Sequence, residues 1–351
     1  MASGIYSDSM VLAARVTALL VISAILLVLV VIAAMRIKIV AAERANNILI
    51  KRWRPLLMQS LAGMEVFPPP LSRAGFVPIL YLWNHFHEIL KGDPITRLNL
   101  FGKKARLNRA AVNLLQKGNV RNQLLAIKTL GNMRDKDEWK KIRDLAVSSH
   151  PVVSLAAARA MIVIDPEEAV NFIIPVVIRR STWPGAIVAT ILRQMGPDIV
   201  SKPLADAVYR AAPNDMPRVI RYLETAHYGV IRPTVHKILS SSKNDEVVSA
   251  CLQVMQDPDD LYIVRRYMNH QSWFIRLQVA RTLGRIGTWP DMDRLIELLK
   301  DQSWWVRYRA AQSLTEMPFI EKEKLKQIMH EQGDRYARGI LSQVLAEKGL
   351  V

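Results

Sequence analysis

The longest apolar pattern in the chain lies close to its N-terminus. Residues 16–35 carry no charged side chain, and their only polar positions are Thr17 and Ser23. A core helix would show a regular polar stripe, which this window lacks. Twenty helical residues rise about 30 Å, which matches the hydrocarbon thickness of a bilayer. The pattern predicts a transmembrane helix over residues 16–35, after a short extracytoplasmic tail, residues 1–15.

A cleavable signal peptide and a buried core helix are the two alternatives to this anchor. A signal peptide has a shorter apolar region and a small-residue cleavage site. Here the apolar run ends at Ala33, Ala34, Met35 and Arg36, without an A-x-A pattern. Both the length and the absence of charge therefore favour an uncleaved anchor.

The charges beside the window predict its orientation. Only Arg15 and Asp8 precede it, whereas six basic residues and one acid, Glu43, lie within residues 36–54. Positively charged flanks stay on the cytoplasmic side. We therefore expect a single-pass protein of the bacterial cytoplasmic (inner) membrane, with its N-terminus outside and its C-terminal part in the cytoplasm. The single cysteine, Cys251, agrees with a reducing compartment.

Internal repeats define the rest of the chain. Residues 270–287 and 301–318 align at an offset of 31, and the aligned pairs share Gln, Ser, Trp, Arg, Ala and Leu. Weaker copies begin at Asn119, His150, Asn244 and Gly333, and Gly or Pro separates most helical segments. About eight units over residues 119–351 predict an α-solenoid. The fold class is thus all-α, with a single N-terminal transmembrane helix followed by a solenoid.

The repeat pattern resembles the bacterial HEAT-like repeats first associated with phycobilisome lyases. In these repeats a polar residue or His precedes Val-Arg, small residues and Leu-Gly. The resemblance implies αα units stacked into a superhelix, the α-solenoid of HEAT-like helical repeats. It implies little about function, because most proteins with such repeats are not lyases.

Two segments connect the anchor to the repeats. Residues 36–75 are expected to form a basic juxtamembrane helix and then a Pro-rich linker around Pro68, Pro69 and Pro70. Residues 76–118 are expected to form an irregular helical cap on the first repeat. The apolar start of this segment could instead lie flat in the membrane interface.

The net charge of +17 is unevenly distributed. Residues 36–150 hold 21 Lys or Arg against 8 Asp or Glu, whereas residues 151–351 hold 26 against 22. This concentration beside the anchor favours contact with anionic lipid head groups. The candidate lipid-contacting residues are Arg36, Lys38, Lys51, Arg52, Trp53 and Arg54. A solvated face is the alternative. A nucleic-acid-binding HEAT-like protein is the runner-up explanation of this charge, but it would require the basic surface to follow the repeats, so nucleic acid is not the expected partner.

Aromatic pairs recur one repeat apart. Trp273-Phe274 and Trp304-Trp305 are followed in phase by Arg276 and Arg307. Because adjacent helical residues point about 100° apart, both rings of a pair cannot easily be buried. The pairs predict a surface that binds a protein partner. Packing between repeats is the alternative for the rings, and contacts within or between units for the arginines.

Catalytic motifs are not evident. The His-Glu pairs at His87 and His330 prompt comparison with deoxyhypusine hydroxylase, a HEAT-repeat enzyme that holds two irons with four such pairs. Two pairs are missing here, so a metalloenzyme of that type is a weak alternative. We expect no enzyme activity, no cofactor and no small-molecule substrate. The sequence predicts a membrane-anchored scaffold or adaptor for a membrane-associated protein, as in envelope polysaccharide machinery.

Overall fold

The computed structural model describes the backbone of residues 2–350 and the side chains of residue 12 and residues 15–350 except residue 117. Over this range the chain forms α-helices and short 3-10 helices, with no strand. The all-α prediction is therefore confirmed for the described residues. The chain divides into two compact units: unit 1 ends at Glu138, and unit 2 runs from Trp139 to the C-terminus.

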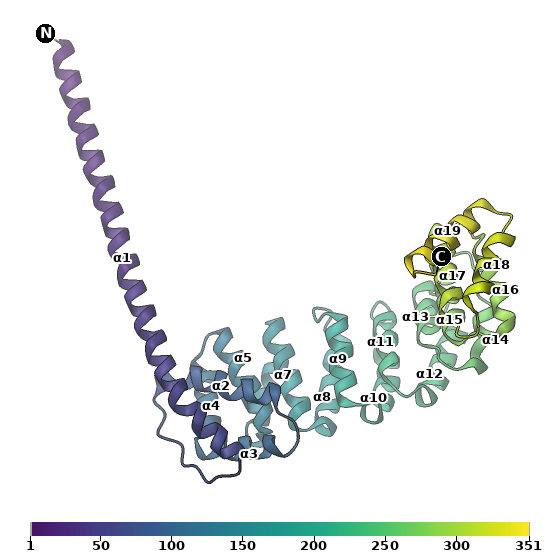
Figure 1. Ribbon diagram of the computed structural model, residues 1–351, viewed down its shortest axis with the longest axis horizontal. Coiled ribbons are helices and arrows are strands. Elements are labelled where there is room, and N and C mark those ends of the chain that lie inside the picture. The colour runs from purple at the N-terminus through teal and green to yellow at the C-terminus, as the bar shows by residue number, and fades with distance from the viewer. Residues whose placement is uncertain (1, 351) are drawn as a thin grey trace. The chain divides into compact units, whose positions relative to one another are not determined.

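The first helix of unit 1, α1 (Ala2–Leu61), is 60 residues long and is drawn as the long rod in Figure 1. The predicted window and the juxtamembrane helix are thus one continuous element. Its stretch Arg15–Leu61 contains a segment apolar and long enough to cross a membrane, with a mean hydropathy of 3.2 and no buried residue in that segment. This composition is compatible with an anchor, and equally with a signal sequence or a helix buried by another partner.

α1 ends at a glycine because the chain reverses there. Gly63 has a φ of +88°, a left-handed conformation that glycine adopts without a Cβ penalty. The amide of Met64 donates to the carbonyl of Gln59 at 3.0 Å, and that of Gly63 to Ser60 at 3.1 Å. These bonds satisfy carbonyls at the end of the helix. The linker then runs without regular structure to residue 72.

Four helices complete unit 1 after the short 3-10 turn Arg73–Gly75. They are α2 (Phe76–Ile89), α3 (Asp93–Lys104), α4 (Leu107–Lys117) and α5 (Val120–Met133). α1 packs on α2 and α3, and α5 packs on α2 and α4. The segment expected as an irregular cap is therefore three regular helices, and the first predicted repeat helix, α5, packs within the same compact unit.

The last turns of α1 belong to the core of unit 1. Trp53 is only 1% exposed and meets Phe101 of α3 edge-on, with ring centroids 6.0 Å apart. Leu57, one turn later, is equally buried. The prediction that Trp53 contacts lipid is therefore wrong. Its indole packs between α1 and α3, because the helices that follow the linker, α2 and α3, pack against the end of α1.

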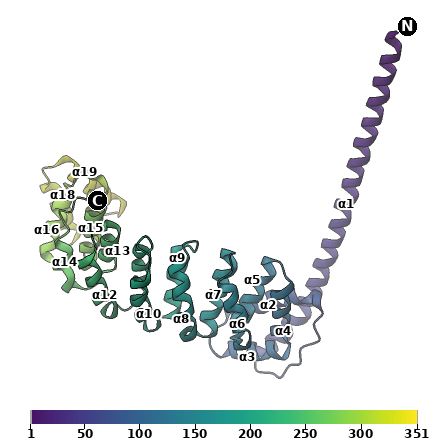
Figure 2. The ribbon, with the colours of Figure 1, turned by 180° about the vertical axis from the view of Figure 1, so that it is seen from behind.

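Unit 2 is a run of helices in two layers. In order they are α6 (Trp139–Ala146), α7 (Pro151–Ile164), α8 (Pro166–Arg179), α9 (Gly185–Met195), α10 (Pro197–Arg210), α11 (Met216–Tyr222), α12 (Tyr228–Ser241), α13 (Asp245–Val254), α14 (Leu261–Arg265), α15 (Trp273–Ile286), α16 (Trp289–Leu298), α17 (Trp304–Glu316), α18 (Lys322–Glu331) and α19 (Arg335–Glu347). From α7 to α19 each odd-numbered helix packs on the next odd-numbered one. The even-numbered helices from α8 to α12 lie in a second layer, as Figures 1 and 2 show.

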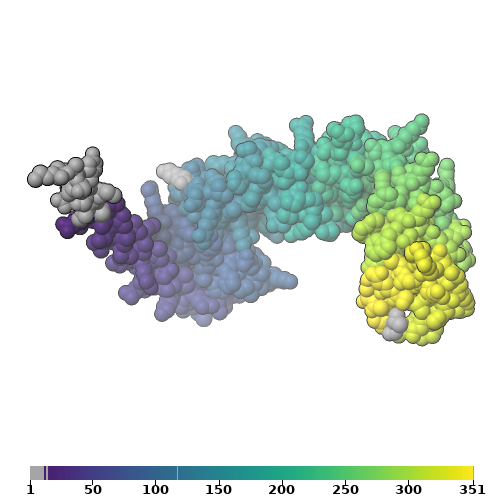
Figure 3. Space-filling model, turned by 90° about the horizontal axis from the view of Figure 1, so that it is seen from above, coloured from purple at the N-terminus to yellow at the C-terminus, as the bar shows by residue number. Residues whose placement is uncertain are grey.

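Small residues set the close spacing of the repeats. A Cβ atom placed on Gly284 of α15 would lie 2.5 Å from the Cβ of Ser313 on α17, so only glycine fits there. Ala280 and Ala311 are fully buried in the same layer. Figure 3 shows the resulting side-chain surface of unit 2, in teal to yellow, as one continuous packed body.

Candidate functional site

The aromatic pairs predicted as a partner surface begin two neighbouring helices. Trp273 is the first residue of α15, and Trp304 is the first residue of α17. Trp273, Trp304 and Trp305 are all exposed, whereas Phe274 is half-buried.

The rings on α17 pack on one another rather than into the core. Trp304 stacks on Tyr308, with centroids 5.0 Å apart and planes 10° from parallel. Trp305 meets Trp304 edge-on at 4.8 Å. We call Trp304, Trp305 and Tyr308 the aromatic cluster. The hydroxyl of Tyr308 also donates to Glu347 of α19 at 2.7 Å, which ties the cluster to the last helix.

A third aromatic position continues the pattern and was not among the predicted site residues. Phe274, Trp305 and Tyr336 are the second residues of α15, α17 and α19, at successive offsets of 31. We call these three side chains the aromatic ladder. Trp305 and Tyr336 are both 57% exposed. The offset of 31, extended by one repeat, would have found Tyr336 from the sequence.

The two predicted arginines mainly hold the loops between repeats. Arg276 donates to both carboxylate oxygens of Asp301, at 2.6 and 2.8 Å, and to the carbonyls of His270 and Gln271. Arg307 donates to the carbonyls of Asp301 and Gln302 at 2.8 and 3.1 Å. The structure thus supports the alternative in which the arginines make contacts within and between units.

Arg307 also belongs to the aromatic surface. Its guanidinium lies 5.7 Å from the ring centroid of Tyr336, and that of Arg335 lies 4.6 Å from the same ring. A cation over an aromatic face is attracted by the ring quadrupole. The ladder therefore carries positive charge at its Tyr336 end.

A second group of cations lies on the same helix faces as the ladder. Arg281 and Arg285 follow Phe274 by two and three turns on α15, and Arg309 follows Trp305 by one turn on α17. Arg309 pairs with Glu316 at 2.7 Å, and Arg285 donates to the carbonyls of Gln253 and Met255. Arg281 is exposed and makes no hydrogen bond or ion pair to the described residues.

Like-charge repulsion among these arginines is visible in their pKa values. Desolvation lowers the pKa of Arg285, Glu224 opposes that shift, and Arg281 and Arg309 add to it. Desolvation likewise lowers the pKa of Arg309, with Glu316 opposing and Arg281 adding to the shift. We call Arg281, Arg285 and Arg309 the arginine group; Glu224 acts against the shift at Arg285 and Glu316 against the shift at Arg309.

The predicted lipid-contacting basic residues are all exposed on α1. Arg36 and Lys38 follow the apolar window directly. Lys51, Arg52 and Arg54 lie 16 to 19 residues beyond Met35. At 1.5 Å per residue, this places them about 24 to 28 Å further along the helix axis.

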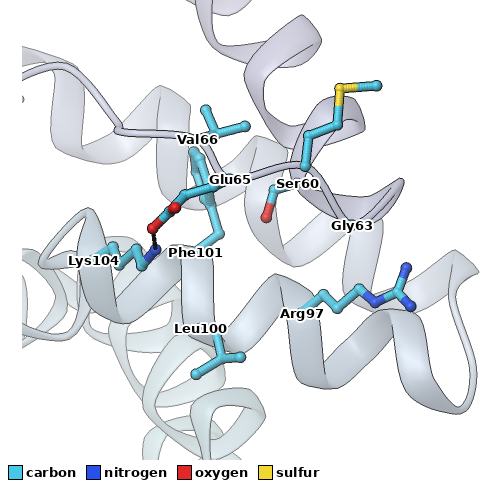
Figure 4. A pocket seen from close by; sticks show the side chains of 9 residues that line it. Ser60, Gly63, Glu65, Val66, Arg97, Leu100, Phe101 and Lys104 are labelled. Carbon is cyan, nitrogen blue, oxygen red and sulfur yellow. Dashed lines mark hydrogen bonds and ion pairs between the residues drawn. The ribbon is translucent and has the colours of Figure 1, made fainter.

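A cleft lies where α1 ends (Figure 4). Its volume is about 320 Å³ and its lining includes Ser60, Met64, Glu65, Arg97, Phe101 and Lys104. Arg97 donates to the carbonyl of Leu61 at 2.9 Å, and Lys104 pairs with Glu65 at 3.4 Å. These cations therefore join the end of α1 and the linker to α3.

The His-Glu pairs have local partners. His87 Nε2 lies 2.7 Å from the amide oxygen of Asn99, its ring contacts Trp83 at a tilt of 51°, and burial lowers its pKa. Glu88 pairs with Lys128, and Glu331 accepts a hydrogen bond from Gln327. Among the described side chains, no group of three or more His, Cys, Asp or Glu converges as a metal site.

Comparison with known proteins agrees with the repeat architecture. A family model described as HEAT repeats matches residues 232–315 and 265–346. The match lies in the C-terminal repeats, and over these residues the chain is similar to HEAT repeats. No curated protein matches its sequence.

One solved structure with a similar chain is the crystal structure of an engineered protein from the Northeast Structural Genomics Consortium. The two chains are 17% identical over 77% of this chain and 85% of that one, with a TM-score of 0.32. The family match and the paired helices therefore carry the fold assignment. The finer resemblance to phycobilisome-lyase repeats stays a prediction.

Proposed function

We propose that this protein is a non-enzymatic scaffold or adaptor, anchored in the bacterial cytoplasmic membrane by α1, that binds a protein partner through unit 2. HEAT repeats typically mediate protein–protein interactions, in accord with this proposal. The observation that carries it is the exposed aromatic surface of α15, α17 and α19. Exposed, clustered Trp and Tyr side chains are the type most enriched at protein-binding hot spots.

The continuous α1 would act as a spacer in this arrangement. Contact between α1 and the rest of unit 1 begins near Leu49, whose side chain approaches Gly75. About fourteen residues separate Met35 from Leu49, a rise of about 20 Å. A rigid helix of this length would hold the rest of unit 1 just beyond the lipid head groups, rather than in contact with them.

The spacer limits which basic residues could touch lipid. Arg36 and Lys38 would lie at the head groups, where each basic residue gains about 1 kcal/mol against anionic lipid. Lys51, Arg52 and Arg54 would lie beyond about two Debye lengths of the surface. We therefore propose that these three only contribute to orientation, with the positive charge kept in the cytoplasm.

We infer that the partner is itself membrane-associated. Tethering converts binding beside the membrane into an intramolecular event at a raised effective concentration. Such a gain is useful only when the partner or its substrate is confined to the same layer. Enzymes or transporters of envelope polysaccharide systems fit this requirement.

The test is affinity purification of the full-length tagged protein from its native membranes in mild detergent. We expect a stoichiometric membrane protein to co-purify, and to be lost from the double variant Trp304→Ala, Trp305→Ala. The matched control is Trp289→Ala, because Trp289 is as exposed, at 56%, but lies on α16, outside the three ladder helices, and contacts Phe319. Retention of the partner by the double variant would refute the aromatic surface as its site.

Orientation is tested separately with sealed membrane vesicles. We expect protease to degrade unit 2 in inverted vesicles and to leave it intact in right-side-out vesicles. Release of the protein by alkaline carbonate, which strips peripheral proteins, would overturn the proposal that α1 is an anchor.

A further inference from the structure

The spacing of the aromatic ladder matches a particular backbone conformation of a ligand. α15, α17 and α19 pack in sequence, and packed helices lie about 8 to 10 Å apart. Phe274, Trp305 and Tyr336 therefore recur at about this distance along the layer. A polyproline II helix repeats every three residues, at about 9.3 Å. An extended strand repeats the same side every two residues, at about 6.6 Å, and does not match.

The surface is open beside the Tyr336 end of the ladder. Gly339 lies three residues after Tyr336 on the same face of α19. Nothing lies within 4 Å of where its Cβ would be. The corresponding position on α17 carries Tyr308, so the surface of α19 beside the ladder has a small residue where α17 has a large one. Glycine inside a helix costs about 1 kcal/mol relative to alanine. At Gly339 the missing side chain would let the backbone of a ligand pass close to α19.

Charge around the ladder selects an acidic ligand. The guanidinium groups of Arg307 and Arg335 flank Tyr336, and Arg281 of the arginine group is exposed without a partner among the described residues. Glu316 pairs with Arg309 and Glu224 acts on Arg285, which leaves Arg281 as the cation of the group that a ligand carboxylate could reach. A ligand with carboxylates beside the rings would relieve the repulsion among these cations.

We propose that the aromatic ladder binds an acidic, proline-containing protein segment in the polyproline II conformation, with every third side chain on a ring and carboxylates toward Arg281 and Arg335. The inference rests on the proposed scaffold function and specifies the part of the partner that unit 2 recognises. The preformed polyproline II helix loses little conformational entropy on binding.

The probe is a fluorescein-labelled peptide of four Ala-Pro-Glu triplets, titrated with the full-length protein in detergent micelles. Two matched peptides replace Glu by Lys, or Pro by Gly. We expect the Ala-Pro-Glu peptide to bind at least about tenfold more tightly than either, because one loses the charge match and the other the preformed conformation.

Variants separate recognition from unfolding. Trp305→Ala should weaken binding of the Ala-Pro-Glu peptide at least about tenfold, whereas Trp289→Ala should leave it unchanged. Arg281→Glu should weaken the Glu peptide and strengthen the Lys peptide. An unfolded variant could not gain affinity for the Lys peptide, so this reversal identifies a direct charge contact.

Three results would overturn the inference: equal affinity for all three peptides, no binding up to about 1 mM, or Trp305-dependent binding of a thymidine decamer in preference to the peptide. If one of these results is obtained but the membrane partner still co-purifies with the wild type and not with the Trp304 and Trp305 double variant, the scaffold function stands and only the ligand class is wrong. If no partner co-purifies, the proposed function itself fails.

Discussion

At the scale of single residues, buried carboxylates hold the repeats of unit 2 together. Asp291 is fully buried and accepts hydrogen bonds from Arg265 at 2.8 Å and from the amide of Thr288 at 2.9 Å. Asp260, one repeat earlier by the same offset of 31, accepts from Arg232 at 2.9 Å, from His236 at 2.8 Å and from the hydroxyl of Tyr228. A buried carboxylate is tolerated only with such partners.

Replacing Asp291 should destabilise unit 2. Asp291→Asn removes the charge while Arg265 stays half-buried, and we expect a loss of about 2 kcal/mol in unfolding free energy. Asp293→Asn is the matched control, because Asp293 is exposed two residues along the same helix. Thermal unfolding of the two variants measures the difference. An equal midpoint for both would show that the buried ion pair contributes nothing.

The same residue predicts a pH dependence. Burial alone would raise the pKa of Asp291, but hydrogen bonds from Arg265 and Thr288 outweigh it and hold the pKa below its usual value. The lowered pKa stabilises the folded state above about pH 4 and is lost as pH falls through the folded pKa. The stability difference between the wild type and Asp291→Asn should therefore shrink as the solution is acidified below about pH 4. A constant difference would contradict this assignment.

Cys251 should be inert in the folded protein. It is buried on α13, and burial raises its pKa to about 12. Because the thiolate is the reactive form, almost none is present at pH 8. We expect the thiol reagent DTNB to react with Cys251 only after denaturation. Rapid reaction of the native protein would place Cys251 at an accessible site.

At the scale of elements, α1 combines two roles that one helical pattern does not distinguish. Its apolar window is exposed, whereas its last turns are in the core of unit 1 through Trp53 and Leu57. Lys51, Arg52 and Arg54 stay exposed around the buried indole. The basic residues around Trp53 predicted an exposed surface and are exposed, but Trp53 itself packs against α3.

Trp53 should therefore matter for folding rather than for lipid binding. Trp53→Ala leaves a cavity against Phe101, and we expect unit 1 to lose about 3 kcal/mol or more of stability. Arg52→Ala should change stability by less than about 0.5 kcal/mol. Protease susceptibility of the linker at residues 62–72 reports the difference. If Trp53→Ala instead weakened only binding to anionic vesicles, the lipid interpretation would be restored.

At the scale of the whole molecule, each unit of the solenoid depends on its neighbours. Arg276 of α15 binds both oxygens of Asp301, which precedes α17, so a charge pair links successive repeats. In repeat proteins stability is a sum of unit and interface contributions, and a weakened interface lets the terminal units open locally.

Arg276→Ala should therefore open the C-terminal repeats selectively. We expect faster amide hydrogen exchange in α17 and α19, with α7 to α10 unchanged, because the lost pair lies at one interface. The double variant Arg276→Ala, Asp301→Ala should lose less than the sum of the single losses. Uniformly faster exchange throughout unit 2 would show that the solenoid unfolds as one cooperative body.

The repeat sequence predicted the solenoid class, with repeats over residues 119–351, but the regularity of the repeats varies along this range. The HEAT family match covers residues 232–346, where the offset of 31 is regular, whereas the paired helices in the structure start earlier, at α7. Upstream repeats vary in length and carry prolines inside helices, such as Pro175 and Pro203. Helix pairing tolerates such variation because packing requires only an apolar face of the right size.

By itself the sequence determined the helical class, the apolar length of α1 and the phase of the repeats. Each of these depends on periodicity within one helix or between copies of one helix pair, which local patterns record. Only the tertiary structure decided that Trp53 is buried, that Trp304 and Trp305 are both exposed, and that Arg276 binds Asp301. Burial and pairing depend on which distant segment covers a side chain, and no local pattern contains that partner.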